Sequence, residues 1–292
     1  MFSRAVDLGM KILLYSFSVN DLAGRGIAEA LASMLGLEIE SVVNTKMALI
    51  AKGPDYIIAG FKDDVLFMDY LHKYFENADF IVMLSRHSSA AKIPSLTVHH
   101  TGNFGPRALY GGNPYELGIA NPLVAYVMLR KLKELATIHK LADVEISYEA
   151  THHGPTSVNK PLTFIEIGSS KAEWIRKDLH SIVARAAYEA LRLFREEIKP
   201  NCIPSIGIGG GHYPRKHTKL SLEKPFCYGH IISKRALDEL ELEEFERALK
   251  MCLERSVPRP KALVAEKKSV KSAYRRIAKD FALTMGLDYV EI

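Results

Sequence analysis

Short runs of apolar residues alternate along the chain with longer stretches in which apolar residues recur every three or four positions. The short runs are typical of strands buried in a sheet, and the longer pattern is typical of helices with one buried face. The runs predict strands at 11–18, 56–60, 80–86, 95–100, 144–151, 162–168, 203–210, 227–233, 262–266 and 288–292.

The helical pattern predicts helices at 21–36, 66–76, 120–142, 171–197, 235–254 and 267–285. Asn20 or Asp21 can cap the first helix. Ser169 or Ser170 can cap the helix that starts at 171, where Glu173 would complete a capping box with Ser170. Because strands and helices alternate, we expect an α/β fold with a mixed, mostly parallel sheet covered by helices.

No repeat, low-complexity tract or linker divides the chain, so residues 10–292 are predicted to form a single α/β domain. Residues 1–9 are interpreted as a leader, disordered if Met10 is the true initiator. The Gly/Pro-rich segment 102–118 has the length of a loop that usually carries function inside a compact domain.

Composition is that of a soluble globular protein, with 48% hydrophobic and 25% charged residues. No apolar run approaches the ~18 residues of a membrane span, so we expect a cytoplasmic protein that does not associate with membranes. Glutamine is absent while Lys, Arg and Glu are frequent, which favours a thermophilic source.

Cys202, Cys227 and Cys252 are odd in number and lack C-x-x-C spacing. This pattern argues against both a disulfide framework and a thiolate zinc site. We therefore predict buried or incidental thiols.

The distribution of the eleven histidines is the most informative chemical feature. "SRH" follows the strand 80–86, "HHTGN" closes 95–100, "THHGP" closes 144–151, and "GGGHYPRKH" closes 203–210. Ligands of open α/β sheets bind beyond the carboxyl ends of the strands. We therefore expect the histidines of these four motifs to meet at one rim of the sheet.

Imidazole is the commonest ligand of zinc, and a catalytic zinc ion usually has about three protein ligands and one open position. Neighbouring side chains diverge, so one member of each histidine pair is expected to bind the metal. The predicted ligands are His100, His152 and His212, with the choice between His152 and His153 left open. A structural role for all of these histidines is the competing interpretation.

Two glutamates are expected near the same rim as these histidines. Glu166, flanked by apolar residues, and Glu149 are candidates for a ligand, a general base or a partner that orients a histidine. We predict Glu166, Glu149 and His153 as the catalytic residues.

Two basic features suggest a polyanionic partner. The glycine run in "GIGGGHYPRKHTK" (207–219) is neither a Walker A nor a dinucleotide motif, but its N–H groups could bind a phosphate or carboxylate. In the helix predicted at 267–285, four cations recur every four residues. They form either a stripe that contacts phosphates or an ordinary solvated face. The net charge is +5. The predicted contacts with nucleic acid are Arg215, Lys216, Lys267, Lys271, Arg275 and Lys279.

The motifs "KILLYSFSVNDLAGRGIAEAL", "SRH", "HHTGN", "THHGP", "FIEIGSS" and "GIGGGHYP" together resemble the archaeal and plant-type D-aminoacyl-tRNA deacylase family. The resemblance runs from about Met10 to the C-terminus. It implies a phosphorylase/hydrolase-like α/β fold and an enzyme that hydrolyses the ester between a D-amino acid and the terminal ribose of tRNA, thereby recycling mischarged tRNA. It also implies Zn²⁺ as cofactor, with one or two ions per chain.

Within this hypothesis, zinc activates a water molecule and polarises the ester, and a glutamate moves the proton. We expect a monomer, with an oligomer left open. The alternatives are a zinc-dependent peptidase or amidohydrolase, a nucleoside phosphorylase-like enzyme, or an RNA-binding module with structural histidines. The predicted substrate-binding residues are His99, Asn103, Arg107, Gly210, Gly211 and Tyr213.

Overall fold

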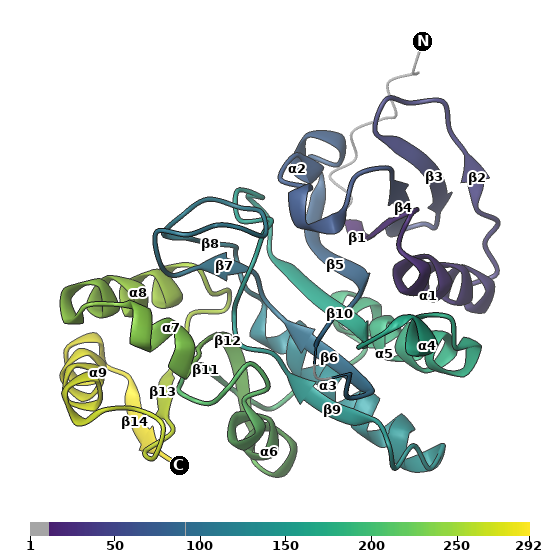
Figure 1. Ribbon diagram of the computed structural model, residues 1–292. Coiled ribbons are helices and arrows are strands. Elements are labelled where there is room, and N and C mark those ends of the chain that lie inside the picture. Colours follow the sequence, from purple (N-terminus) through teal and green to yellow (C-terminus); the bar gives the residue numbers. More distant parts are fainter. Residues whose placement is uncertain (1–11, 91) are drawn as a thin grey trace.

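This computed structural model describes residues 12–90 and 92–292 (Figure 1). The leader predicted at 1–9 lies outside these ranges. Within them, no helix is long and apolar enough to cross a membrane.

The larger sheet has the strand order β2-β3-β4-β1-β5-β10-β6-β9. Strands β4, β1, β5 and β10 are mutually parallel, as are β6 and β9, whereas β2, β3 and β4 pair antiparallel, and so do β10 and β6. The predicted mixed, mostly parallel sheet is therefore confirmed. Its strands are β1 (Ile12–Ser18), β2 (Glu40–Ser41), β3 (Met47–Lys52), β4 (Tyr56–Phe61), β5 (Ala78–Arg86), β6 (Ser95–His99), β9 (Glu145–Tyr148) and β10 (Leu162–Gly168).

Helices α1 (Leu22–Met34), α3 (Pro122–Ile138) and α5 (Lys177–Phe194) cover one face of this sheet. Alternate strand residues point to opposite faces. In β10, Ile165 and Ile167 pack into the core beneath these helices, so Phe164 and Glu166 point to the other face. The site described below lies on that other face.

A second, all-parallel sheet has the order β12-β11-β13-β14. It packs with the C-terminal helices around a separate core, and a two-stranded ribbon, β7-β8, lies between the sheets (Figure 1). These elements are β7 (Gly102–Asn103), β8 (Glu116–Leu117), β11 (Ile203–Ile208), α6 (Arg215–Glu223), β12 (Phe226–Ile232), α7 (Lys234–Glu239), α8 (Leu242–Glu254), β13 (Ala262–Ala265), α9 (Ser272–Met285) and β14 (Asp288–Glu291).

Side-chain hydrogen bonds to the backbone accompany the breaks in two of the predicted helices. The helix predicted at 235–254 breaks at Leu240, which is extended and buried and whose carbonyl accepts a hydrogen bond from the Tyr274 hydroxyl at 2.6 Å. The helix predicted at 171–197 consists of α4 (Lys171–Trp174) and α5, and the His180 ring donates to the carbonyl of Trp174 between them at 2.8 Å.

Two further helix predictions need correction. The stretch 66–76 forms only a 3-10 turn, η1 (Val65–Phe67), and the short α2 (Leu71–Tyr74). The helix predicted at 267–285 begins only at Ser272, so Lys267 and Lys271 precede it and are not part of a helical stripe. The predicted caps are confirmed: Asp21 accepts from two N–H groups at the start of α1, and Ser170 and Glu173 form a capping box.

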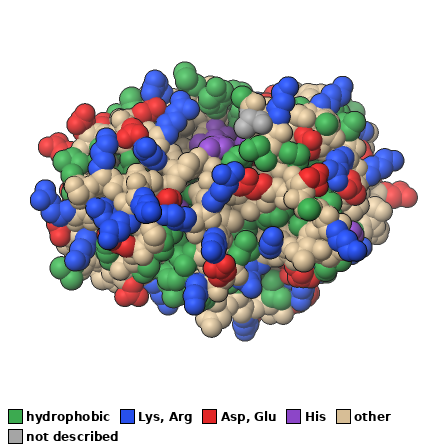
Figure 2. All heavy atoms as spheres, turned by 60° about the horizontal axis from the view of Figure 1, so that its bottom comes forward, with side chains coloured by type: hydrophobic (Ala, Val, Ile, Leu, Met, Phe, Trp, Pro, Cys, Tyr) green, Lys and Arg blue, Asp and Glu red, His purple; other side chains and the backbone are tan. Residues whose placement is uncertain are grey.

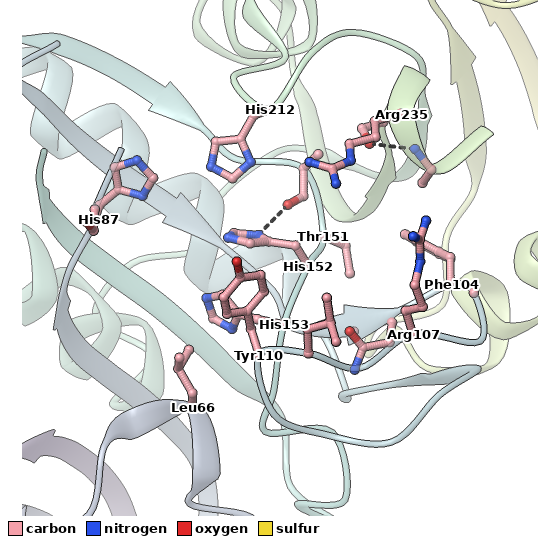
Figure 3. A pocket seen from close by; sticks show the side chains of 18 of the residues that line it. Leu66, His87, Phe104, Arg107, Tyr110, Thr151, His152, His153, His212 and Arg235 are labelled. Carbon is pink, nitrogen blue, oxygen red and sulfur yellow. Dashed lines mark hydrogen bonds between the residues drawn. The ribbon is translucent and has the colours of Figure 1, made fainter. Parts of the chain in front are cut away.

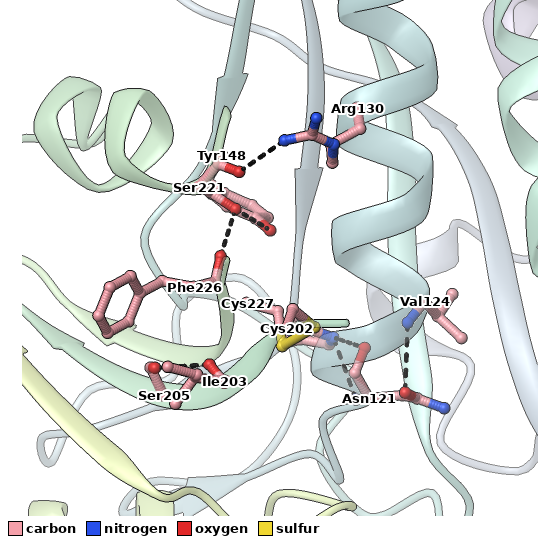
Figure 4. Close-up of a disulfide and its surroundings, with 11 residues drawn as sticks. Asn121, Val124, Arg130, Tyr148, Cys202, Ile203, Ser205, Ser221, Phe226 and Cys227 are labelled. Carbon is pink, nitrogen blue, oxygen red and sulfur yellow. Dashed lines mark hydrogen bonds between the residues drawn. A yellow bond between two sulfur atoms is a disulfide. The ribbon is translucent and has the colours of Figure 1, made fainter. Parts of the chain in front are cut away.

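The prediction of free thiols is wrong for two of the three cysteines. Cys202 and Cys227 form a disulfide with Cα atoms 5.8 Å apart, while Cys252 is free and buried (Figure 4). The parallel pairing of β11 with β12 places Pro204 opposite Cys227, which brings Cys202 into reach. The register of two strands 25 residues apart in sequence, invisible in the cysteine spacing, decides this contact.

His217 of α6 predicts a pH dependence of folding stability. Its ring is fully buried and donates to the carbonyl of Ile208 at 3.2 Å, and burial lowers the pKa of His217 to about 4. In the unfolded chain this histidine binds a proton near pH ~6.5, whereas in the folded chain it stays neutral down to about pH 4. Its contribution to the free energy of unfolding is therefore complete above pH ~6.5 and is lost as the pH falls toward 4. We expect His217→Gln to reduce the difference in unfolding free energy between pH 7 and pH 4 by on the order of 3 kcal/mol.

Urea denaturation at both pH values measures this difference. The exposed His139 at the end of α3 supplies the control, because His139→Gln should keep the wild-type pH dependence. An unchanged pH dependence in His217→Gln would contradict the assignment.

Candidate active site

Histidines from four segments converge over the face of the larger sheet that carries Glu166. The sequence led us to expect these histidines at one rim of the sheet. They do not share a rim, because β6 and β9 run antiparallel to β5 and β10. The carboxyl ends of β5 and β10 therefore point in one direction, and those of β6 and β9 point in the opposite direction. Side chains meet across the sheet face instead, where Phe164 of β10 pairs with His99 of β6 and their rings stack at 4.9 Å.

Glu149 is the most connected carboxylate of the site. It is buried, and its oxygens lie 2.8 Å from Nε2 of His212, 3.0 Å from Nδ1 of His87 and 3.5 Å from Nε2 of His152. Burial alone would raise the pKa of Glu149, but the contacts with His212 and His87 outweigh it and hold the pKa well below its usual range. The carboxylate is therefore ionised.

Glu166 lies between two imidazoles. One of its oxygens is 3.5 Å from Nδ1 of His87 and 3.7 Å from Nε2 of His99. Burial would raise the pKa of Glu166, but these two rings lower it below its usual value. Burial opposes a charge on His87, yet contacts with Glu149 and Glu166 prevail and raise the pKa of His87 to about 11.

Backbone carbonyls fix the rings of the adjacent pair. Nδ1 of His152 lies 2.8 Å from the carbonyl of Ala150, and Nδ1 of His153 lies 2.6 Å from the carbonyl of Gly154. A carbonyl only accepts, so Nδ1 carries the proton in both rings and Nε2 keeps a lone pair for a ligand. His153 also has a positive φ of 45°, an uncommon conformation for a residue other than glycine.

The donor atoms fall into compact groups suited to a metal ion. Each group places its ligand atoms within 4.8 Å of one another: His87, Glu149 and His212; His99, His152 and His153; and His99, Glu149 and Glu166. Both oxygens of Glu149 and Nε2 of His99 are buried, with no aligned hydrogen-bond partner in the described part of the chain. Imidazole nitrogen and carboxylate oxygen form the usual donor set of catalytic zinc, so these residues fit such an ion.

A cavity of about 750 Å³ opens above this cluster. Figure 2 shows histidines in a hollow of the surface, with hydrophobic side chains along its edge. His152, His153, His212 and Glu166 line one part of the cavity, and Phe104, Arg107 and Arg235 line another (Figure 3). The volume is that of a typical small-molecule site.

Comparison with known proteins assigns the family. The family model for D-aminoacyl-tRNA deacylase matches residues 74–290. The chain belongs to the D-aminoacyl-tRNA deacylase family. This confirms the resemblance seen in the sequence motifs and the prediction of an enzyme.

Relatives span almost the entire chain. The D-aminoacyl-tRNA deacylase of Staphylothermus marinus is 45% identical over 285 residues, covering 96% of this chain and 100% of the relative. That of Desulfurococcus amylolyticus is 43% identical, covering 91% of this chain and 94% of the relative. The crystal structure of a conserved protein of unknown function aligns with a TM-score of 0.84 and 28% identity over 96% of this chain and 95% of its own.

In this deacylase-family fold, His100 is not brought to the histidine cluster. It is buried on the other side of its strand end, where Nδ1 lies 2.6 Å from the carbonyl of Gly229. Its Nε2 lies 3.1 Å from both the N–H of Asn121 and the hydroxyl of Thr163. Burial lowers the pKa of His100 to about 3, so the ring is neutral and both of its nitrogens already have partners.

The predicted catalytic and substrate-binding residues take different places. Glu149, Glu166 and His153 all lie in the cluster, and so does His99, predicted to bind substrate. Asn103 and Arg107 line the cavity. Gly210 uses its N–H for Ser269 and its carbonyl for Lys234, whereas Gly211 is exposed.

His87 received no role from the sequence although it contacts both glutamates. Its motif "SRH" was one of the four strand-end signals, but strand direction hid its nearness to Glu149. Tyr213, predicted to bind substrate, places its hydroxyl 2.7 Å from Nε2 of His87.

The cations predicted to contact tRNA are mostly paired with this chain's own carboxylates. Arg215 forms a bidentate pair with Glu145 at 2.7 and 2.8 Å. Four more form a single ion pair with a carboxylate: Lys216 with Glu266, Lys271 with Asp238, and both Lys267 and Arg275 with Glu291. Lys279 is exposed and forms no ion pair with any described residue.

Removing His87 should destabilise the metal-free protein. His87→Ala leaves Glu149 and Glu166 buried with one cationic partner fewer, which typically costs about 3–5 kcal/mol for a buried pair. Guanidinium denaturation in the presence of a chelator measures the loss, with the surface variant His139→Ala as control. Equal stabilities of the two variants would show that the carboxylates do not depend on His87.

Proposed function

We propose that this chain hydrolyses the ester bond of D-aminoacyl-tRNA, releasing the D-amino acid and free tRNA and so recycling mischarged tRNA. Family membership supports the reaction. The observation that carries the proposal is the set of imidazoles around two buried, ionised carboxylates, next to a cavity large enough for an aminoacyl ester.

Zinc is the proposed cofactor. His87, Glu149 and His212 would hold one ion, and His99, His152 and His153 would hold a second where two bind. When bound, zinc supplies a Lewis acid that polarises the ester carbonyl and makes water a stronger nucleophile near neutral pH. Thiolates take no part, because the cysteines lie in the disulfide or in the core.

Glu166 is the proposed general base. Its carboxylate is ionised and lines the cavity, so it can accept a proton from an attacking water molecule and return it to the ribose oxygen that leaves. Glu149 is less suited, because three histidines surround it and His212 lies at 2.8 Å. Its role is to hold these rings in position.

Selectivity for the D-enantiomer requires contacts that reject the L-form. We propose that the 102–118 loop provides them, since Asn103, Phe104 and Gly105 line the same cavity as His152 and His153. The amide of Asn103 is fixed by the carbonyls of Gly111 and Asn113, which keeps this wall in one conformation.

For the body of the tRNA we propose the edge that carries Arg215, Lys216, Lys267, Lys271, Arg275 and Lys279. Most of these cations exchange a carboxylate partner for a phosphate when the tRNA binds. Each therefore adds less binding free energy than a cation without such a partner would. Lys279 has no carboxylate partner among the described residues. Of the six cations it is therefore expected to add the most binding free energy.

The central experiment compares D- and L-tyrosyl-tRNA with and without chelator. We expect release of D-tyrosine only, its loss after chelation, and its recovery on addition of Zn²⁺. Undiminished activity in protein shown by elemental analysis to be metal-free would exclude the zinc proposal. Equal rates on both enantiomers would exclude the D-specific one.

Glu166→Gln tests the general base. It preserves shape but cannot accept the proton, so kcat should fall by on the order of 10²–10⁴-fold. Glu29→Gln, at an exposed position of α1, is the matched control and should retain wild-type kcat. Zinc content measured on the same samples separates loss of the base from loss of metal, and a wild-type kcat in Glu166→Gln would assign the proton transfer to another group.

A further inference from the structure

Large apolar side chains stand exposed beside the cavity. Phe67 is 56%, Leu109 76% and Tyr110 67% exposed. Leu109 and Tyr110 line the cavity, and the Phe67 ring lies next to Gly111, which joins the three into one patch. Figure 3 shows Tyr110 close to His153 of the cluster. More than half of the surface of each residue is exposed to water, so covering the patch with a flat apolar partner lowers the free energy.

The backbone beneath this patch is fixed. The carbonyl of Tyr110 accepts a hydrogen bond from the N–H of Gly154 at 3.0 Å, which ties it to the residue after His153. Gly111 and Gly112 have φ values of 80° and 74°, and side chains there would collide with Leu66 and Thr156. Tyr110 and Leu109 are therefore presented in a set position relative to the cluster.

A cationic group lies in another part of the same cavity. Arg107 is 2.9 Å and Arg235 3.6 Å from the same oxygen of Glu239. Two guanidinium groups sharing one carboxylate leave a net positive charge. Figure 3 shows both arginines across the cavity from His87 and His212.

The proposed reaction decides what can occupy these two surfaces, and this inference rests on it. If the ester lies at the histidine–glutamate cluster, the ribose that carries it brings a base and a 5′-phosphate into the cavity. A base needs a flat apolar or aromatic surface, and a phosphate needs a cation. The apolar patch and the arginine pair supply one of each.

We propose that Tyr110, with Leu109 and Phe67, is the stacking surface for the bases at the single-stranded 3′ end of tRNA, and that Arg107 and Arg235 bind its terminal phosphate groups. A partner of this chemistry matches both the apolar patch and the positive charge in one continuous cavity. The enzyme thereby recognises an aminoacyl ester through its nucleotide as well as through its amino acid.

Binding of uncharged RNA tests the stacking surface without any hydrolysis. The probes are a fluorescent RNA minihelix with a 3′ single-stranded CCA end and the same minihelix with a blunt end. Tyr110→Ala should weaken binding of the CCA minihelix by about tenfold, the usual effect of losing one stacked base, and leave the blunt one unchanged. Tyr110→Phe should retain wild-type affinity, as should Leu283→Ala, which removes an 83% exposed side chain from α9.

The salt dependence of the same binding tests the arginines. Replacing both Arg107 and Arg235 by Ala should reduce the slope of log affinity against log salt by about 0.7 for each phosphate that the protein no longer neutralises. Lys140→Ala, an exposed cation after α3, should leave the slope as in the wild type. An unchanged slope in the double variant would show that these arginines bind no phosphate.

The stacking surface would be overturned if Tyr110→Ala and wild type bound the CCA minihelix with equal affinity, or if Tyr110→Ala lost equal affinity for both minihelices. A change in the sedimentation of Tyr110→Ala without a change in RNA affinity would also overturn it, and would assign the patch to self-association. The outcome is independent of the proposed reaction. A wild-type protein that binds the CCA end but cleaves no D-aminoacyl-tRNA would disprove the reaction and keep the surface.

Discussion

Burial of two ionised carboxylates on one sheet face is the constraint on which the rest of the structure depends. Glu149 and Glu166 are 2% and 3% exposed, and a buried carboxylate stays ionised only with cationic or donating partners. Those partners come from the end of β5, from β6 and from the loop after β11. The segments must converge because no single strand could supply enough of them.

This requirement also joins the two sheets. His212 follows β11 of the smaller sheet, yet its ring contacts Glu149 of the larger one. Two backbone hydrogen bonds reinforce the contact, from the N–H of Ala150 to the carbonyl of His212 and from the N–H of Thr151 to the carbonyl of Ile231. The site therefore forms only when the sheets are docked, and the cavity lies where they meet.

Much of the fold could be predicted from the sequence because it depends on local patterns. Buried strands such as 162–168 and caps such as Asp21 are determined by neighbouring residues. Strand direction, by contrast, depends on partners far away in sequence. Because β6 runs antiparallel to β10, the histidines meet on a face of the sheet and not at a rim. For the same reason the contact between His87 and Glu149 could not be predicted. The Cys202–Cys227 bond and the break at Leu240 depend on equally distant contacts.

Hydrogen bonding by the second ring nitrogen decides which histidines are free to act as ligands. His152 and His153 donate Nδ1–H to carbonyls of neighbouring residues, which leaves Nε2 available. His87 engages Tyr213 through Nε2 and turns Nδ1 toward Glu149. In His100 the neutral ring donates through one nitrogen and accepts through the other, so no lone pair remains. Adjacent histidines with the same sequence signal thus diverge in role, and only their long-range partners distinguish a ligand from a structural ring.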